Sequence, residues 1–346
     1  MKKFYIKLMQ AALVMLLCSI TVSAHDFETD GIYYIITSDT TVEVSYKGAS
    51  ASEINNEYSG NVVIPDKVIY NEKTYSVTSI GKDAFYRSDS LTSITLSNSL
   101  TEIKNNAFFG CYNLTAVHVS DISTLCKIKF NDNESNPLYR AKNLFLNNEP
   151  VTDLVIPEGV TTIETFAFCG CESFTTVTIP SSVTTIGKGA FYLCTSITDL
   201  YINDLTAWCN IELSSWASPM NYAKNIYLKG ELLTNLVIPE NVTEIKNETF
   251  NCCSNITSVT LHDKITGIGS YAFQNCTGLT SITIPNSVTS IQQGAFAGCT
   301  GLTNVTIPES LTTLEGYTFA NCTSLTNVTI PESLTTLEVY TFSGCI

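Results

Sequence analysis

Histidine and basic residues are scarce in this chain of 346 residues, which has three His and only 18 Lys and Arg against 32 Asp and Glu. So acidic a surface repels phosphate backbones and anionic lipid headgroups, which disfavours binding to nucleic acid or to a membrane surface. The sequence also lacks a glycine-rich phosphate-binding motif, a calcium-loop pattern and the paired Cys or His spacing of a zinc site. We therefore expect no cofactor and no bound metal.

The three histidines offer little for catalysis. Nucleophilic catalysis requires a base within hydrogen-bond reach of a Cys or Ser. His25 follows the expected signal cleavage site, His118 lies at an outward strand position, and His262 stands where neighbouring repeats have Pro. The repeated Cys residues are expected to point inward, away from His118. We predict that the protein is not an enzyme and has no catalytic residues.

What the sequence does contain is a short repeat with a fixed period. Apolar strand patterns return at a constant step, and so does a cysteine, at Cys253, Cys276, Cys299, Cys322 and Cys345. A constant period of about 23 residues indicates a solenoid of stacked coils, in which each coil contacts its neighbours and the core forms a long column. We therefore predict a β-rich solenoid.

One unit, residues 279–301, shows the coil at its clearest. Its first apolar residues alternate with polar ones, as in a strand of a parallel stack. Pro285 ends this strand because it has no N–H to donate, and residues 288–291 form a second short β segment. A tight helical or 3-10 turn is then expected to bury Phe296 and Cys299.

Two longer units interrupt the period, at about residues 120–155 and 203–237, and their sequences resemble each other. In both, an aspartate precedes a short amphipathic helix, Asp121 in the first copy and Asp204 in the second. Aspartate is a preferred N-cap because its carboxylate accepts the free backbone N–H groups of the first turn. We predict that each unit forms a wider coil with an outer loop.

The N-terminal part of the chain, up to Tyr75, differs from the repeats. Residues 1–24 combine three Lys, an apolar run and small residues at the cleavage positions, which is typical of a signal peptide and too short for a stable membrane span. Cys18 leaves a lipid anchor as an alternative, although Leu17 before it is not the small residue that such processing prefers. Residues 25–75 contain two alternating segments around a turn, so we predict a β-hairpin cap together with the first coil, followed by the solenoid at residues 76–346.

The mature chain is expected to be even more acidic, because its 15 basic residues stand against 32 acidic ones once the signal is removed. Its last unit stops within a coil, so we expect either a truncated repeat or an end that pairs with another surface.

Thirteen cysteines in an exported chain would ordinarily indicate a disulfide framework. Here eight of them keep the same repeat position, so each is expected to stack on its copy in the next coil with the side chains parallel, which is a poor disulfide geometry. We predict free thiols that pack as small buried apolar groups. The neighbouring pairs Cys169 and Cys171, and Cys252 and Cys253, leave the alternative open.

The unit L-x-x-I-x-I-P-x-x-V-x-x-I-x-x-x-A-F-x-x-C resembles the bacterial leucine-rich repeat of the BspA-like, Treponema-type class, over nearly all of the mature chain. The resemblance implies a curved solenoid with a parallel sheet on one face, exported to the surface or surroundings of host-associated microbes. Members of this class are associated with adhesion to host matrix or cells and with coaggregation between bacteria. The repeat carries over no catalytic or ligand-binding residue.

The outward strand positions supply a candidate binding face. Thr recurs at one position of the coil, and His118 and Tyr201 interrupt this ladder near the two irregular units. Ordered hydroxyls can bind sugar, protein or ice, although Thr is also a good strand former that keeps a surface solvated. An aromatic side chain among small polar ones is typical of an interface anchor. The predicted face consists of His118, Thr178, Tyr201, Thr260, Thr283, Thr306 and Thr329.

These observations predict a secreted or cell-surface protein that binds an extracellular protein or a cell surface, in the manner of an adhesin, without enzymatic activity and without membrane insertion after signal removal. One alternative is a structural, self-associating envelope spacer. Another is a carbohydrate-recognition module, which exposure of Trp208, Trp216 and Tyr139 would favour.

Overall fold

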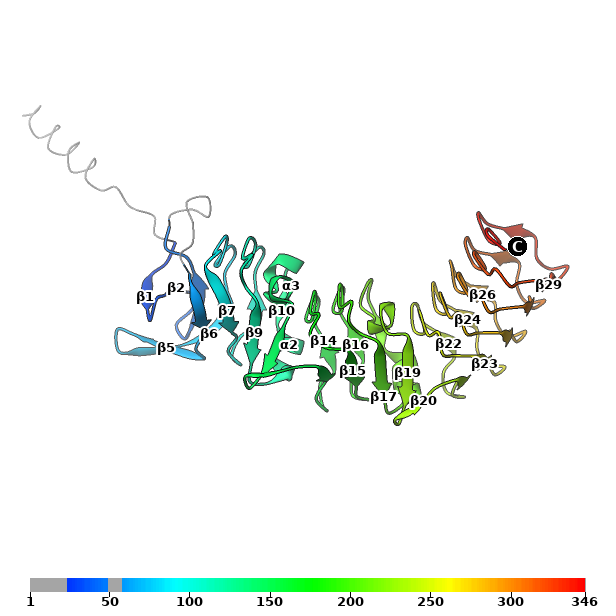
Figure 1. Ribbon diagram of the computed structural model, residues 1–346, viewed down its shortest axis with the longest axis horizontal. Helices are drawn as coiled ribbons and strands as arrows, with labels where there is room; N and C mark the ends of the chain where they lie inside the picture. Colours follow the sequence, from blue (N-terminus) through cyan, green and yellow to red (C-terminus); the bar gives the residue numbers. More distant parts are fainter. Residues whose placement is uncertain (1–23, 49–57, 346) are drawn as a thin grey trace, which may run out of the picture.

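The computed structural model describes residues 24–48 and 58–345. The predicted signal peptide lies outside the described residues, apart from its last position, Ala24. Figure 1 shows an elongated, curved stack of coils that advances steadily from the N-terminal hairpins to the last repeats. Within the described residues, no helix has the length and apolar character needed to cross a membrane.

Each coil contributes one longer strand to a parallel sheet, and we call the surface of this sheet the long-strand face. Its apolar residues point inward and its polar residues outward, as the alternating pattern predicts. The pairing falls into three successive blocks. The strands are β4 (Gly60–Val63), β7 (Leu91–Thr95), β9 (Ala116–Val119) and β11 (Leu144–Leu146); β13 (Asp153–Val155), β15 (Thr176–Ile179), β17 (Asp199–Ile202) and β19 (Asn225–Leu228); and β21 (Asn235–Val237), β23 (Ser258–Thr260), β25 (Ser281–Thr283), β27 (Asn304–Thr306) and β29 (Asn327–Thr329).

A second, two-residue strand in most coils forms further parallel ladders on another side of the column. It corresponds to the second β segment expected from the sequence, which in the unit around Pro285 is Ser290–Ile291. The solenoid therefore carries parallel pairing on two sides. These strands are β8 (Glu102–Ile103), β10 (Lys129–Phe130), β14 (Thr162–Ile163), β16 (Thr185–Ile186), β18 (Glu212–Leu213), β22 (Glu244–Ile245), β24 (Gly267–Ile268), β26 (Ser290–Ile291), β28 (Thr313–Leu314) and β30 (Thr336–Leu337).

The remaining side of each coil is a turn, which in most coils contains an Ala-Phe or Thr-Phe pair and the cysteine, and we call this side the turn edge. Phe296 is fully buried and stacks between Phe273 and Phe319, with ring centroids 5.5 and 5.4 Å apart. The thiol of Cys299 donates to the carbonyl oxygen of Phe273 in the preceding coil, at 3.1 Å. The turn is held by separate i to i+3 hydrogen bonds rather than by a continuous helix. All 12 cysteines in the described residues are free, which confirms the prediction of unpaired thiols.

Helices occur in the two irregular coils, where α2 (Ile122–Lys127), η2 (Asn133–Ser135), α3 (Leu138–Ala141), α4 (Leu205–Asn210) and η3 (Pro219–Asn221) lie. The carboxylates of Asp121 and Asp204 accept backbone N–H groups at the starts of α2 and α4, which confirms both predicted N-caps.

Each irregular coil then ends in a β-hairpin, because β11 pairs antiparallel with β12 (Glu149–Pro150) and β19 with β20 (Glu231–Leu232). The hairpin strand occupies the edge on which the next coil would pair. The long-strand sheet is therefore interrupted at both places, and a new block begins.

The N-terminal part forms the expected hairpin cap over the start of the column (Figure 1). Its strands are β1 (Phe27–Thr29), β2 (Ile32–Ile36), β3 (Thr41–Ser45), β5 (Lys67–Tyr70) and β6 (Lys73–Ile80). The third strand, β3, pairs in parallel with β6, which continues into the short-strand ladder through β8. The buried carboxylate of Glu43 contacts the ammonium of Lys104 at 2.6 Å and accepts from the hydroxyl of Ser79 at 2.9 Å. This ion pair links the cap to the coils beneath it.

Candidate functional site

On the long-strand face, the register of the long strands and of their hairpin strands places one set of outward side chains in a single row. We call this set the central row. All seven residues of the predicted binding face lie in it. In chain order the row consists of Val63, Thr95, His118, Phe145 and Pro150; Val155, Thr178, Tyr201, Tyr227 and Leu232; and Val237, Thr260, Thr283, Thr306 and Thr329.

Two aromatic pairs stand in this row at equivalent places in the first two blocks. His118 stacks on Phe145 with ring centroids 4.8 Å apart, and Tyr201 stacks on Tyr227 at 4.6 Å. The first member of each pair, His118 or Tyr201, was predicted from the sequence, and the second, Phe145 or Tyr227, was not. The similarity of the two irregular units was the available signal, because it aligns residues 144–146 with 226–228 and so shows an aromatic residue at the same place in both.

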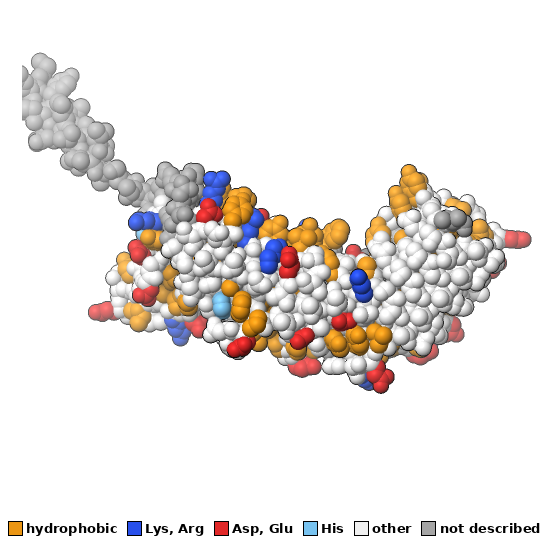
Figure 2. All heavy atoms as spheres, in the orientation of Figure 1, with side chains coloured by type: hydrophobic (Ala, Val, Ile, Leu, Met, Phe, Trp, Pro, Cys, Tyr) orange, Lys and Arg blue, Asp and Glu red, His pale blue; other side chains and the backbone are white. Residues whose placement is uncertain are grey.

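The row also exposes large aliphatic side chains to solvent. Val63 is 54% exposed, Val155 56%, Leu232 44% and Val237 60%. In Figure 2, hydrophobic side chains gather along both long margins of the middle part of the molecule. Scattered single apolar residues are common on protein surfaces, but four that share one row with two stacked aromatic pairs indicate an interaction surface.

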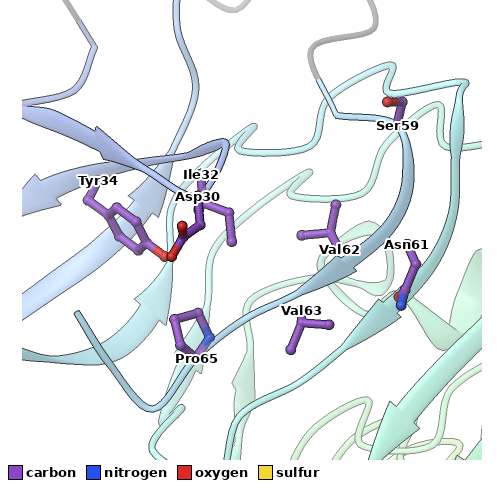
Figure 3. Close-up of a pocket in the computed structure, with 8 residues that line it drawn as sticks. All are labelled: Asp30, Ile32, Tyr34, Ser59, Asn61, Val62, Val63 and Pro65. Carbon is purple, nitrogen blue, oxygen red and sulfur yellow. The ribbon is translucent and has the colours of Figure 1, made fainter.

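Two hollows lie along the row. The first, of about 440 Å³, is at its N-terminal end, where Tyr34 and Asp30 of the cap face Val62 and Val63 of β4 (Figure 3). Burial, and to a smaller extent the charge of Asp30, raise the pKa of the Tyr34 hydroxyl well above its usual range, so this group stays neutral.

The second hollow, of about 290 Å³, lies where the first block meets the second. Leu146, Pro150 and Val155 are among its lining residues. Because Pro150 pairs with Phe145 across the β11–β12 hairpin, this hollow lies next to the first aromatic pair.

Carboxylates flank the second aromatic pair. Asp153 accepts a hydrogen bond from the hydroxyl of Thr176 at 2.7 Å, and Asp199 accepts one from the side-chain amide of Asn225, also at 2.7 Å. The pKa of the Tyr201 hydroxyl is raised by desolvation first, and then by Tyr227 and by the two carboxylates. This phenol therefore remains protonated and able to donate a hydrogen bond.

The third block presents threonine instead of aromatic side chains. A neighbouring threonine ladder supports the stack, because the hydroxyls of Thr280 and Thr303 donate to backbone carbonyls of the preceding coil at 3.2 and 3.3 Å. The central-row hydroxyls of Thr283 and Thr306 have no hydrogen bond to the described residues, so they face solvent. The aromatic part of the row is thus confined to the first two blocks.

Among the residues that the structure describes, no group of three His, Cys, Asp or Glu is placed to hold a metal ion. Burial raises the pKa of the repeat thiols, for example to about 12 for Cys111, so they are poor nucleophiles. The Nδ1 atom of His118 is buried and has no hydrogen-bond partner in the described part of the chain.

The three aromatic residues whose exposure would favour carbohydrate recognition differ in how far they are exposed to solvent. Trp208 is 2% exposed, and its indole N–H donates to the carbonyl of Thr249 at 3.1 Å. Tyr139 is half-buried. Trp216 is 61% exposed and meets the condition.

The fold and the central row define a leucine-rich repeat solenoid with an extended outward surface. The family model described as BspA type leucine rich repeat region matches this chain in 6 copies, over residues 66–136, 140–217 and 221–346. The chain belongs to this family.

The chain is also similar to solved structures. A leucine-rich cell surface protein from Faecalibacterium prausnitzii is 22% identical over 92% of each chain, with a TM-score of 0.54. A leucine-rich repeat protein from Bacteroides ovatus is 24% identical over 93% of each chain, with a TM-score of 0.45. The pneumococcal vaccine antigen PcpA is 16% identical over 92% of this chain and 88% of its own, with a TM-score of 0.45. No curated protein sequence matches this chain.

Proposed function

We propose that this protein is exported and binds a protein or cell-surface partner along the central row, without enzymatic activity. The observation that carries the proposal is the line of exposed aliphatic and stacked aromatic side chains across the first two blocks. Water leaves such side chains favourably when a partner covers them. Aromatic residues in particular bring a large contact area with few rotatable bonds.

The two aromatic pairs are the expected anchors. In each pair one ring already restricts the other, so binding has little side-chain entropy left to remove. Asp153 and Asp199 lie beside the second pair and favour a partner that presents basic or hydrogen-bond-donating groups there. The exposed threonines of the third block then extend the row as a solvated surface.

The test is a binding screen of purified residues 25–346 against immobilised matrix proteins, intact host or bacterial cells, and a glycan array. A variant combining His118→Ala with Tyr201→Ala removes one ring from each aromatic pair. The matched control combines Thr283→Ala with Thr306→Ala, which changes the same row in the third block.

Saturable binding to a protein or to cells that the aromatic variant loses and the threonine variant keeps supports the proposal. Equal binding by both variants would show that the central row is not the contact surface. If the parent protein binds none of the proteins or cells tested, a structural, self-associating role is favoured instead.

A further inference from the structure

A second aromatic cluster lies on the turn edge, on a different surface from the central row. In this turn, the residue that precedes the Ala or Thr, which Phe follows in the regular coils, has a positive φ in many coils, and bulky residues often occupy it. Phe166 and Trp216 both have φ 59° there, and Tyr340 has φ 60°. The same backbone angle recurs from coil to coil, so it belongs to the architecture of the turn, where it places successive large side chains along one edge.

Two of these rings line a groove of about 460 Å³, together with Tyr192 and Gly189. The glycine makes room for the first ring, since a Cβ at Gly189 would lie 2.6 Å from Cε1 of Phe166. Tyr192 meets Trp216 edge to face, with ring centroids 6.1 Å apart. The groove thus offers three aromatic rings to a ligand, one of them largely open to solvent.

The charge of the groove differs from that of the chain. Among the described residues, Lys188 is the only charged one in the lining, in a protein whose formal net charge is −14. Lys188 forms no ion pair with any residue that the structure describes. The nearby Glu134 is already paired with Arg140, at 2.6 Å between Oε2 and Nη2. The groove is therefore suited to an anionic ligand.

The backbone of the groove is already used within the stack. The N–H groups of Phe166 and Gly189 donate to carbonyl oxygens of the following coil, each at 3.0 Å. An extended peptide obtains much of its affinity from main-chain hydrogen bonds, and these N–H groups cannot supply them. The side chains of Asn133, Lys188 and Trp216, in contrast, have no hydrogen-bond partner among the described residues. They can therefore donate to a ligand.

We propose that this groove binds an acidic oligosaccharide, with the apolar face of one sugar ring against Trp216 and a sugar carboxylate paired with Lys188. Sialic and uronic acids share this chemistry, which combines an apolar ring face, hydroxyl groups and a carboxylate. The site lies on a different surface from the central row, so it goes beyond the function proposed above and either proposal can fail without the other.

Isothermal titration calorimetry with the protein tests this proposal, using sialyllactose and oligogalacturonate as acidic probes and lactose as the neutral control. The variants are Trp216→Ala and Lys188→Gln. Tyr340→Ala is the control for the first, because Tyr340 occupies the same repeat position and is 60% exposed, against 61% for Trp216. Lys67→Gln is the control for the second, because it makes the same charge change in the N-terminal hairpin.

We expect at least one acidic probe to bind and lactose to bind much more weakly. Trp216→Ala should weaken binding about tenfold, which corresponds to the loss of one aromatic contact. Lys188→Gln should weaken it and also reduce its dependence on salt. The two control variants should bind like the parent protein.

Several outcomes overturn the proposal. It is wrong if neither acidic probe binds, or if both groove variants bind as well as their controls. Equal binding of lactose would show that the carboxylate is not recognised. Stronger binding of a polyglutamate peptide, lost in the same two variants, would assign the groove to an acidic protein segment instead. Circular dichroism of each variant shows whether the fold is retained.

Discussion

Tyr201 and Tyr227 stack on neighbouring strands of the long-strand face, with ring centroids 4.6 Å apart and planes within 10° of parallel. They come from different coils, and Tyr227 belongs to the irregular one. The ring of His118 on Phe145 repeats this arrangement one block earlier. In each pair, the two rings therefore support each other across neighbouring strands.

Once a binding partner has been identified, Tyr201→Ala or Tyr227→Ala alone should weaken the binding of that partner by about 2 kcal/mol, as expected for an interface anchor. The double variant should be only slightly worse than either single variant, because each ring holds the other in place. Surface plasmon resonance on the three variants measures this. Fully additive losses would mean that the two rings act independently.

The stacked phenylalanines should dominate the stability of the regular coils. Phe296 is fully buried between two copies of itself, so Phe296→Ala should cost about 3 to 5 kcal/mol by opening a cavity in the column. Thr283→Ala, on the solvated side of the same coil, should change the free energy of unfolding very little. Urea denaturation followed by circular dichroism compares them. Equal losses would mean that the inward and outward faces are reversed.

Gly294 should be sensitive to substitution for two separable reasons. Its φ is +62°, and an added Cβ would lie 2.5 Å from Cε1 of Tyr271. Gly294→Ala should therefore cost more than Gly230→Ala, where φ is +85° and no atom lies within 4 Å of the added Cβ. We expect about 1 to 3 kcal/mol for the backbone strain alone, measured by urea denaturation.

Removing the ring should relieve the clash at Gly294. The double variant Tyr271→Ala, Gly294→Ala should therefore lose less stability than the sum of the two single variants. A strictly additive result would show that the tyrosine moves aside at no cost.

The buried thiols predict a loss of stability at alkaline pH. Burial raises the pKa of Cys209 from 9.0 to about 12. The folded state therefore keeps this proton while the unfolded state loses it, so the contribution is complete below pH 9 and disappears as the pH rises toward 12. Within that window each such thiol should remove about 1.4 kcal/mol per pH unit.

Cys209→Val removes this one titration while keeping a small apolar side chain. The variant should show a smaller decrease in urea midpoint across the alkaline window than the parent protein. An unchanged pH dependence would mean that this thiol is not desolvated in the folded state.

Trp208 should couple the second block to the third. Its indole N–H bonds to the carbonyl of Thr249 across the column, and Trp208→Phe would leave that carbonyl unpaired, at a cost of about 1 to 3 kcal/mol. Trp216→Phe is the matched control, since that side chain is mostly in solvent. The chain has two Trp, so each variant leaves one as a fluorescent reporter of the denaturation curve. Equal effects would argue against a structural role for the buried indole.

The regular coils could be predicted from the sequence because a residue at a repeated position must stack on its own copy. This holds for the Phe296 ladder, for the free thiol of Cys299 and for the outward row that contains Thr283. The helix caps at Asp121 and Asp204 followed from local chemistry in the same way.

The sequence by itself therefore determined the period, the column of buried side chains and the face on which His118 and Tyr201 lie. The tertiary structure alone decided which residues meet where the period breaks. The parallel pairing of β9 with β11 and of β17 with β19 set the partners of the aromatic pairs, and the β-hairpins at the ends of the irregular coils set the interruption of the sheet. The groove beside Trp216 depends on backbone angles and on a glycine in an adjacent coil. Tyr192 and Trp216 belong to coils of different length, so the 23-residue period does not align them and their contact appears only in the tertiary structure.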